Sequence, residues 1–261
     1  MLSYRTLWLS DIHLGIKACQ AGLLLEFLRH AKSETLYLVG DIFDGWELKK
    51  KWYWPESHND VVHDFLRRAR EGTRVIYIPG NHDEMARDYL GRTFGGIQVI
   101  NELIHVTADG KRLLVMHGDQ FDAVMGSAPW LAKLGSAAYI LTLGINWVFN
   151  TLRRALGFPY WSLAAYLKSK VKGAVKHIND YEHFLAEEAR RQGCSGIVCG
   201  HIHRAEIRMI EDILYCNDGD WVESCTALVE HHDGRLEIIN WPKQRDALLE
   251  ATGNRQEATG K

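Results

Sequence analysis

The sequence contains few cysteines and few prolines, and it has no strong excess of charge of either sign. Its 261 residues include 5 cysteines and 5 prolines, and the formal net charge is −2. The cysteine number is odd and no Cys-x-x-Cys pair occurs, which argues against a disulfide framework or a cysteine zinc site and favours a reducing compartment. A net charge near zero gives no general field for nucleic acid, so we expect no nucleic-acid partner.

The N-terminus also lacks a basic stretch followed by an apolar run. The sequence therefore predicts no secretory signal and a cytoplasmic protein. Hydrophobic residues make up 46% of the chain and charged residues 25%, which is ordinary for a globular domain. This composition argues against a disordered chain, a collagen and a simple coiled coil.

Apolar segments with strand and helix spacing alternate along the chain, which predicts an α/β fold. Expected strands are 6–10, 35–39, 74–78, 113–116 and 196–199, and expected helices are 19–32, 59–70 and 180–191. The last third is rich in further strands, expected at 205–210, 213–216, 225–230 and 235–240. The polar tail 243–261 is expected to be flexible.

Five of the predicted strands are each followed by a short group of carboxylate, amide or imidazole side chains. These groups are Asp11-Ile-His13, Gly40-Asp41-Ile-Phe-Asp44, Gly80-Asn81-His82-Asp83, His117-Gly118-Asp119 and Gly200-His201-Ile-His203. Ligands in α/β folds sit at the carboxyl ends of strands, so these side chains are expected to meet. Oxygen and nitrogen donors without thiolate suit Mn²⁺, Fe or Zn²⁺. The glycines allow sharp turns at the sheet edge.

This set of motifs resembles the calcineurin-like metallophosphoesterase family, and it spans residues 11 to 203. The resemblance implies a four-layered α/β/β/α sandwich that holds two divalent metal ions, with Mn²⁺ expected and Fe or Zn²⁺ as alternatives. It implies one metal held by Asp11, His13, Asp41 and His203, and a second held by Asp41, Asn81, His117 and His201. Asp41 would then bridge the two ions.

Two further residues of the motifs match catalytic positions of the family. His82 matches the histidine that lies near the scissile phosphate without binding metal, and Asp44 matches the carboxylate that orients it. Ligand histidines need acceptors for their second ring nitrogen, and Asp119 is a candidate acceptor.

Residues 121–178 differ from the rest of the chain because they are strongly basic. They contain seven Lys or Arg and one acid, and they include the uncharged run 134–152. We predict a metallophosphoesterase core over 1–120 and 179–242 that is interrupted by a helical cap insertion over 121–178. The run 134–152 either packs within the cap or enters lipid, and both possibilities stay open.

The cap lies between the H-G-D and G-H-x-H motifs, as it does in the UDP-2,3-diacylglucosamine diphosphatases of lipid A synthesis, which the chain also resembles. That resemblance implies a phosphorylated lipid or nucleotide-lipid substrate and a site at an anionic membrane surface, peripheral to the inner face of the cell membrane. The candidate phosphate-binding residues are Lys168, Lys170, Lys172 and Lys176, which otherwise form a solvated helix face.

Other readings of the sequence remain open at this point. The best-known members of that lipid group have arginine where this chain has His82. A soluble phosphodiesterase or phosphomonoesterase of unknown substrate is therefore an alternative, and a non-catalytic scaffold that retains the fold is another. A loop with Trp46, Trp52, Trp54 and His58 either lines the pocket or packs on the surface.

Overall fold

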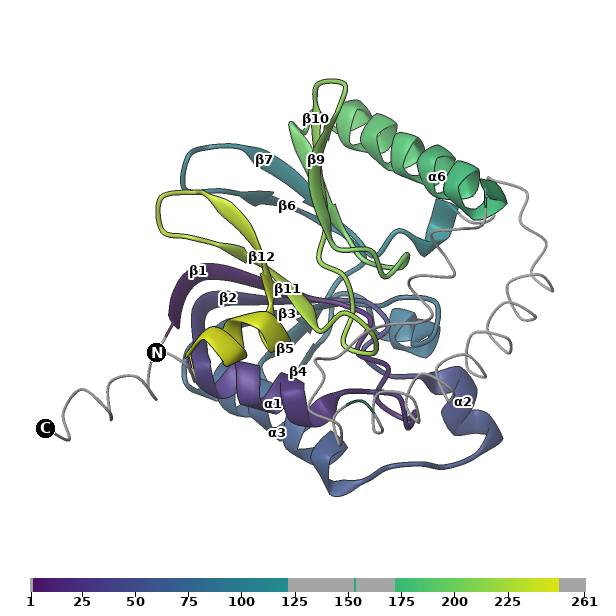
Figure 1. The fold of residues 1–261 in the computed structure, drawn as a ribbon, viewed down its shortest axis with the longest axis vertical. Coiled ribbons are helices and arrows are strands. Elements are labelled where there is room, and N and C mark those ends of the chain that lie inside the picture. The colour runs from purple at the N-terminus through teal and green to yellow at the C-terminus, as the bar shows by residue number, and fades with distance from the viewer. Residues whose placement is uncertain (1, 122–152, 154–171, 249–261) are drawn as a thin grey trace, which may run out of the picture.

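Two β-sheets form the centre of the molecule, and helices cover their outer faces (Figure 1). The computed structural model describes residues 2–121, 153 and 172–248. The larger sheet has the order β12-β11-β1-β2-β3-β5-β4 and the smaller one has the order β6-β7-β8-β10-β9. The larger sheet consists of β1 (Leu2–Leu9), β2 (Ala31–Val39), β3 (Arg74–Ile78), β4 (Thr93–Phe94), β5 (Ile97–Val99), β11 (Thr226–Glu230) and β12 (Leu236–Asn240). The smaller sheet consists of β6 (Leu103–Val106), β7 (Arg112–Val115), β8 (Gly196–Cys199), β9 (Glu206–Ile210) and β10 (Ile213–Asn217).

The central strands of each sheet run parallel, and antiparallel strands flank them. In the larger sheet β1, β2, β3 and β5 are parallel neighbours, and in the smaller sheet β7, β8 and β10 are. Parallel strands place their carboxyl ends at one edge of a sheet. The loops that follow β1, β2 and β3 therefore lie together, as do those that follow β7 and β8.

The helices lie on opposite sides of the sheet pair. Helices α1 (Ala21–His30) and α3 (Glu56–Arg70) pack on the larger sheet, and α6 (Lys172–Arg191) packs on the smaller one (Figure 1). Short helices follow the strand ends: α2 (Gly45–Lys50), η1 (Glu84–Tyr89) and η2 (Asp119–Phe121).

Alternate residues of the same strand belong to different cores. On β2, Leu36 and Leu38 pack toward the helices, whereas Tyr37 and Val39 pack between the sheets. Leu113 of β7 belongs to the same inner core, although it comes from the other sheet. A strand presents successive side chains to opposite faces, so both faces of each sheet are buried. This arrangement confirms the predicted α/β/β/α sandwich.

Several elements differ in extent from the sequence-based prediction. Strand β2 begins at Ala31 and α6 begins at Lys172, four and eight residues before the expected starts. Helix α6 therefore runs across the boundary predicted at 178 between cap and core. Residues 241–248 are helical, so a helix occupies the first residues of the predicted tail, and the remainder lies outside the described residues.

Most of the predicted cap also lies outside the described residues, including Lys168, Lys170 and the run 134–152. Lys172 and Lys176 lie on the first turns of α6. Within the part of the chain that the structure describes, no helix is both long and apolar enough to cross a membrane.

Candidate metal centre

The loops after five strands bring their histidines and aspartates to one place between the two sheets. Backbone hydrogen bonds continue beyond the strands: Asp11 N–H donates to Gly40 O (3.0 Å), and His13 N–H donates to Asp41 O (2.9 Å). The loop after β8 joins the loop after β7 in the same way, because Gly200 N–H donates to His117 O at 3.3 Å. Hydrogen bonds between neighbouring loops therefore fix the positions of these loops.

A first cluster combines Asp11, His13 and His203. Nε2 of His203 lies 3.0 Å from Oδ1 of Asp11 and 3.4 Å from Nε2 of His13. A second cluster combines Asp41, His117 and His201, and its possible ligand atoms all lie within 4.8 Å of one another. Nε2 of His117 lies 3.5 Å from Oδ2 of Asp41.

Asp41 lies between the two clusters. The same Oδ2 that faces His117 is 3.9 Å from Nε2 of His13, which belongs to the first cluster. Its Oδ1 accepts the backbone N–H of His82 at 2.8 Å. A carboxylate that bridges two ions must face the ligands of both, as Asp41 does here.

The donor set fits divalent metal ions. Two ligands of one ion, each bound at about 2.0–2.2 Å, are separated by roughly 3–3.5 Å, which is the spacing of the closest donor pairs here. Nδ1 of His117 donates to Val39 O at 2.8 Å, which leaves the lone pair of its Nε2 available. Nε2 of His117 and Oδ1 of Asn81 are both buried, and neither has a hydrogen-bond partner among the described residues. Unpaired buried polar atoms are costly, and an ion would satisfy them.

The backbone at the clusters adopts a conformation that side chains rarely take. Among the described residues, seven that are not glycine have a positive φ, and five of these are predicted metal ligands. They are Asp11, His13, Asp41, His201 and His203, with φ from 50° to 69°. Left-handed backbone costs free energy in residues with a side chain, and it concentrates at functional sites.

The motif glycines leave space for the ligands rather than only allowing turns. A Cβ on Gly40 would lie 2.2 Å from Nδ1 of His117, and one on Gly80 would lie 2.3 Å from Oδ1 of Asp41. A Cβ on Gly200 would lie 2.5 Å from Oδ2 of Asp11. Any side chain at these three positions would displace a predicted ligand.

His82 and Asp44 adjoin both clusters, and a third possible ligand group combines His82 with His13 and Asp41. Nδ1 of His82 and Nδ1 of His13 each lie 3.1 Å from Oδ2 of Asp44, so one carboxylate faces both rings. Asp44 also caps α2 by accepting the N–H of Glu47 at 2.8 Å. The indole of Trp46 packs on the His82 ring, with 4.1 Å between centroids. Nδ1 of His82 is buried and faces Asp44 without a well-aligned hydrogen bond.

Close opposite charges shift the protonation of the buried groups. Burial alone would lower the pKa of His13, but the hydrogen bond with Asp44 and the charge of Asp41 raise it to about 9. Burial alone would raise the pKa of Asp11, and His203 instead lowers it to about 2. His117 likewise holds the pKa of Asp41 well below its usual range against the effect of burial. The carboxylates therefore carry the negative charge that a cation needs.

Asp83 is a supporting residue to which the sequence reasoning assigned no role. It is fully buried and accepts backbone N–H groups from Gly80 (2.6 Å) and Ile42 (2.8 Å). It thereby ties the loop after β3 to the loop after β2, next to Asp41. Burial and the nearby charge of Asp41 raise its pKa. Its place in the Gly-Asn-His-Asp motif was the available signal.

A second supporting group lies behind Asp11. Ser10 Oγ hydrogen-bonds to Asp11 Oδ2 (2.5 Å) and to Asp218 Oδ1 (2.6 Å), and Asp218 is almost fully buried. The backbone N–H of Trp221 donates to Asp11 O at 3.1 Å. The turn 217–221 therefore supports the Asp11 loop.

Two expectations about neighbouring residues change with the structure. Asp119, the candidate acceptor for a ligand histidine, pairs with Arg87, whose Nη2 lies 2.7 Å from both its carboxylate oxygens. Residues of the aromatic loop take both predicted roles, since one lies at the site and others lie at the surface. Trp46 contacts His82, whereas Trp54 packs on Phe43 and the Trp52 side chain is 73% exposed.

His58 from the same stretch is buried and serves the fold. Its Nδ1 accepts the backbone N–H of Gly15 at 3.1 Å, and burial lowers its pKa to about 4. It therefore holds the loop that follows His13 rather than binding a ligand.

Comparisons with known proteins show which family and which solved structures the chain is similar to. The sequence profile of the calcineurin-like phosphoesterases matches residues 4–205. None of the curated proteins matches the chain.

Among solved structures, similarity to an archaeal phosphodiesterase covers 90% of this chain and 98% of the other, with 13% identity and a TM-score of 0.43. A hypothetical protein from Pyrococcus horikoshii is similar over 95% of this chain and 94% of its own, with 10% identity and a TM-score of 0.47. Vps29 of Entamoeba histolytica in complex with zinc is similar over 90% and 98%, with 12% identity and a TM-score of 0.40.

Proposed function

The chain belongs to the calcineurin-like phosphoesterase family, and from that premise we propose that it cleaves the diphosphate of a UDP-diacylglucosamine-type lipid with two bound metal ions. The family and the His and Asp clusters support the general activity, which is metal-dependent hydrolysis of a phosphoester. The observation that carries the proposal for the site is the position of Asp41 between two donor clusters, with His82 and Asp44 beside them.

The proposed ligands follow the two clusters. Asp11, His13, Asp41 and His203 would hold one ion, and Asp41, Asn81, His117 and His201 would hold the other, with Mn²⁺ as the first candidate. Such ions supply an acidified water nucleophile and charge for the phosphate oxygens. The ligand set contains no thiolate, and all its donors suit a borderline or hard cation.

The chain's own groups would orient the substrate and manage protons. Asp44 faces Nδ1 of His82 at 3.1 Å and would fix the ring, so that Nε2 can donate a proton to the leaving oxygen. The Trp46 indole would hold the ring from its face. Asp44 also faces His13, so the same carboxylate would fix the position of His82 relative to a proposed metal ligand.

The choice of a lipid substrate is supported by the composition of residues 121–178. Seven basic residues and several tryptophans lie in this segment, between the His117 and His201 motifs. Basic side chains suit a diphosphate and an anionic membrane surface, and apolar residues suit acyl chains. We assign phosphate contacts to Lys168, Lys170, Lys172 and Lys176, and we place the protein at the inner face of the cell membrane.

A substrate panel tests the proposal. Purified protein loaded with Mn²⁺ should hydrolyse a diacylated UDP-sugar faster than a matched UDP-sugar without acyl chains, a simple diester or a phosphomonoester. A preference for the simple diester or monoester would favour the phosphodiesterase or phosphomonoesterase alternative. Absence of hydrolysis throughout, with both ions bound, would instead favour a scaffold.

A further inference from the structure

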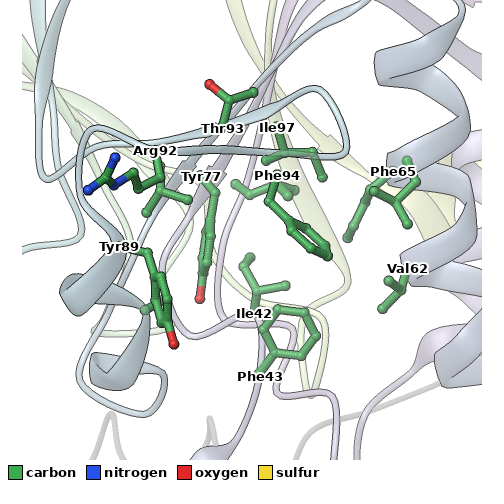
Figure 2. A pocket seen from close by; sticks show the side chains of 14 residues that line it. Ile42, Phe43, Val62, Phe65, Tyr77, Tyr89, Arg92, Thr93, Phe94 and Ile97 are labelled. Carbon is green, nitrogen blue, oxygen red and sulfur yellow. The ribbon is translucent and has the colours of Figure 1, made fainter.

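An apolar cavity of about 600 Å³ lies on the outer side of the larger sheet. Figure 2 shows its walls, formed by Val62 and Phe65 of α3, Phe94 and Ile97 of the β4–β5 hairpin, and Ile42 and Phe43. The volume falls within the range of about 300–1,000 Å³ that small-molecule pockets occupy. None of the predicted metal ligands lines it.

One buried polar residue, Tyr77, lines the cavity. Tyr77 is 8% exposed, and its hydroxyl interacts with the buried carboxylate of Asp83. Figure 2 shows the Tyr77 ring within the group of lining side chains, beside Tyr89. Burial and the charge of Asp83 raise the pKa of this hydroxyl well above its usual range, so it stays a neutral donor. Because Asp83 is its partner, Tyr77 adds no demand for a polar ligand, and the other lining side chains are mostly apolar.

The rim combines a cation with exposed apolar side chains. Arg92 lines the cavity and is exposed, and within the described part of the chain no carboxylate forms an ion pair with it. Tyr89 and Phe94 at the same rim are 62% and 75% exposed. The opening therefore favours a molecule with an apolar body and an anionic end.

We propose that this cavity binds a single straight alkyl chain that ends in an anionic group, with the chain among the apolar walls and the anion at Arg92. The cavity is distinct from the metal centre, so this site holds whether or not the proposed lipid substrate is correct. Ile42 and Phe43 separate Asp41 from Asp44 in the sequence, so the occupant would contact the backbone that carries two residues of the centre.

Calorimetric titration with soluble alkyl ligands below their micelle concentrations tests the site. Octanoate, decanoate and dodecanoate should bind one per chain, with Kd falling about fourfold for each added methylene until the cavity is full. Dodecanol should bind more weakly than dodecanoate, because it lacks the anion. Dodecyl phosphate in place of dodecanoate shows whether the site favours phosphate or carboxylate.

Two variants at the cavity and two matched controls locate the binding. Val62→Trp should fill the cavity, and Thr93→Trp should obstruct its exposed rim without changing the packed walls, so each should weaken dodecanoate binding at least tenfold. Met209→Trp, on the exposed face of β9, should leave it unchanged. Arg92→Gln should remove the preference for dodecanoate over dodecanol, whereas Arg29→Gln at the exposed end of α1 should not.

Treatment with EDTA separates the cavity from the metal centre. Binding of dodecanoate should survive metal removal, because no lining residue is a predicted ligand. The proposal is overturned if dodecanoate does not bind, if binding is lost with the metal, or if folded Val62→Trp and Thr93→Trp bind as the wild type does.

Discussion

Asp83 accepts the backbone N–H of Ile42 at 2.8 Å, so a carboxylate from the loop after β3 holds the loop that follows β2. The same side chain accepts the N–H of its own loop at Gly80. Since Asp41 immediately precedes Ile42, this contact determines where the central carboxylate of the clusters lies. Asp83 therefore positions a predicted metal ligand without being one itself.

Asp83→Asn tests this support. An amide nitrogen cannot accept the N–H groups that the carboxylate now accepts, so the Asp41 loop should shift. We expect metal affinity to fall about 10–100-fold, the range for residues that orient ligands. Metal titration of Asp83→Asn and of Asp88→Asn, an exposed aspartate in η1, provides the comparison. Equal affinities would show that Asp83 serves the fold only.

Asp41→Asn should reduce metal content and turnover together. Asp41 faces both donor clusters, and loss of its charge disturbs two sites at once. Metal analysis of gently purified wild-type protein should approach two equivalents, and the variant should fall well below this. Near-normal turnover by Asp41→Asn would contradict the bridging assignment.

His82→Ala should lower kcat about 10²–10⁴-fold, the usual contribution of a general acid, while metal content stays unchanged. In the proposed mechanism Asp44, 3.1 Å away, orients the ring, so loss of His82 should act mainly on the transition state. His63→Ala, which changes an exposed histidine of α3, is the matched control. Loss of metal from His82→Ala would make His82 a ligand.

His82→Arg extends the test to the substrate. Arginine occupies this position in the best-known members of the lipid group that the chain resembles. Retained hydrolysis of a diacylated UDP-sugar by this variant would support the proposed substrate class, and retained hydrolysis of simple diesters alone would argue against it.

Glu230 should make folding stability depend on pH. Burial alone would raise its pKa, but hydrogen bonds with His105, Thr6 and the Ala108 backbone lower it from 4.5 to about 2. Because the folded pKa lies below the unfolded one, this stabilisation is present above about pH 4.5 and is lost as pH falls toward 2. Between pH 7 and pH 3 the loss amounts to about 2 kcal/mol.

Chemical denaturation of Glu230→Gln at both pH values measures this contribution. The advantage of wild type over the variant should shrink as the pH falls. Glu56→Gln, at an exposed glutamate of α3, should show a smaller change. A constant difference between wild type and Glu230→Gln would show that the ionised carboxylate does not provide the stabilisation.

The basic segment predicts reversible attachment to anionic membranes. Each basic residue near such a surface contributes about 1 kcal/mol, and the attraction fades over the Debye length. Co-sedimentation with liposomes should increase with the anionic lipid content and decrease with salt. Charge reversal at Lys168, Lys172 and Lys176 should weaken it, whereas reversal of Lys49 on α2 should have less effect. Equal binding to neutral and anionic liposomes would exclude the electrostatic contribution.

The sequence by itself determined where most strands lie and which donors follow them. Strand β3 was predicted with its observed bounds, 74–78, because a short apolar run before Pro79-Gly80 encodes a strand locally. Alternation of strands and helices predicted an α/β fold, and the resemblance to the family implied its four layers. The type of a residue determines whether its side chain can bind a metal ion, so the candidate ligands could be named without coordinates.

Only the tertiary structure decided which groups meet across loops. The pairing of Asp119 with Arg87, the hold of Asp83 on Ile42 and the sharing of Asp44 between His13 and His82 join segments far apart in the chain. The hairpin β4–β5 and the cavity beneath it also escaped prediction, since two- and three-residue strands carry too little periodicity to be recognised. Local pattern specifies an element, whereas the partner of a polar group depends on how separate elements pack.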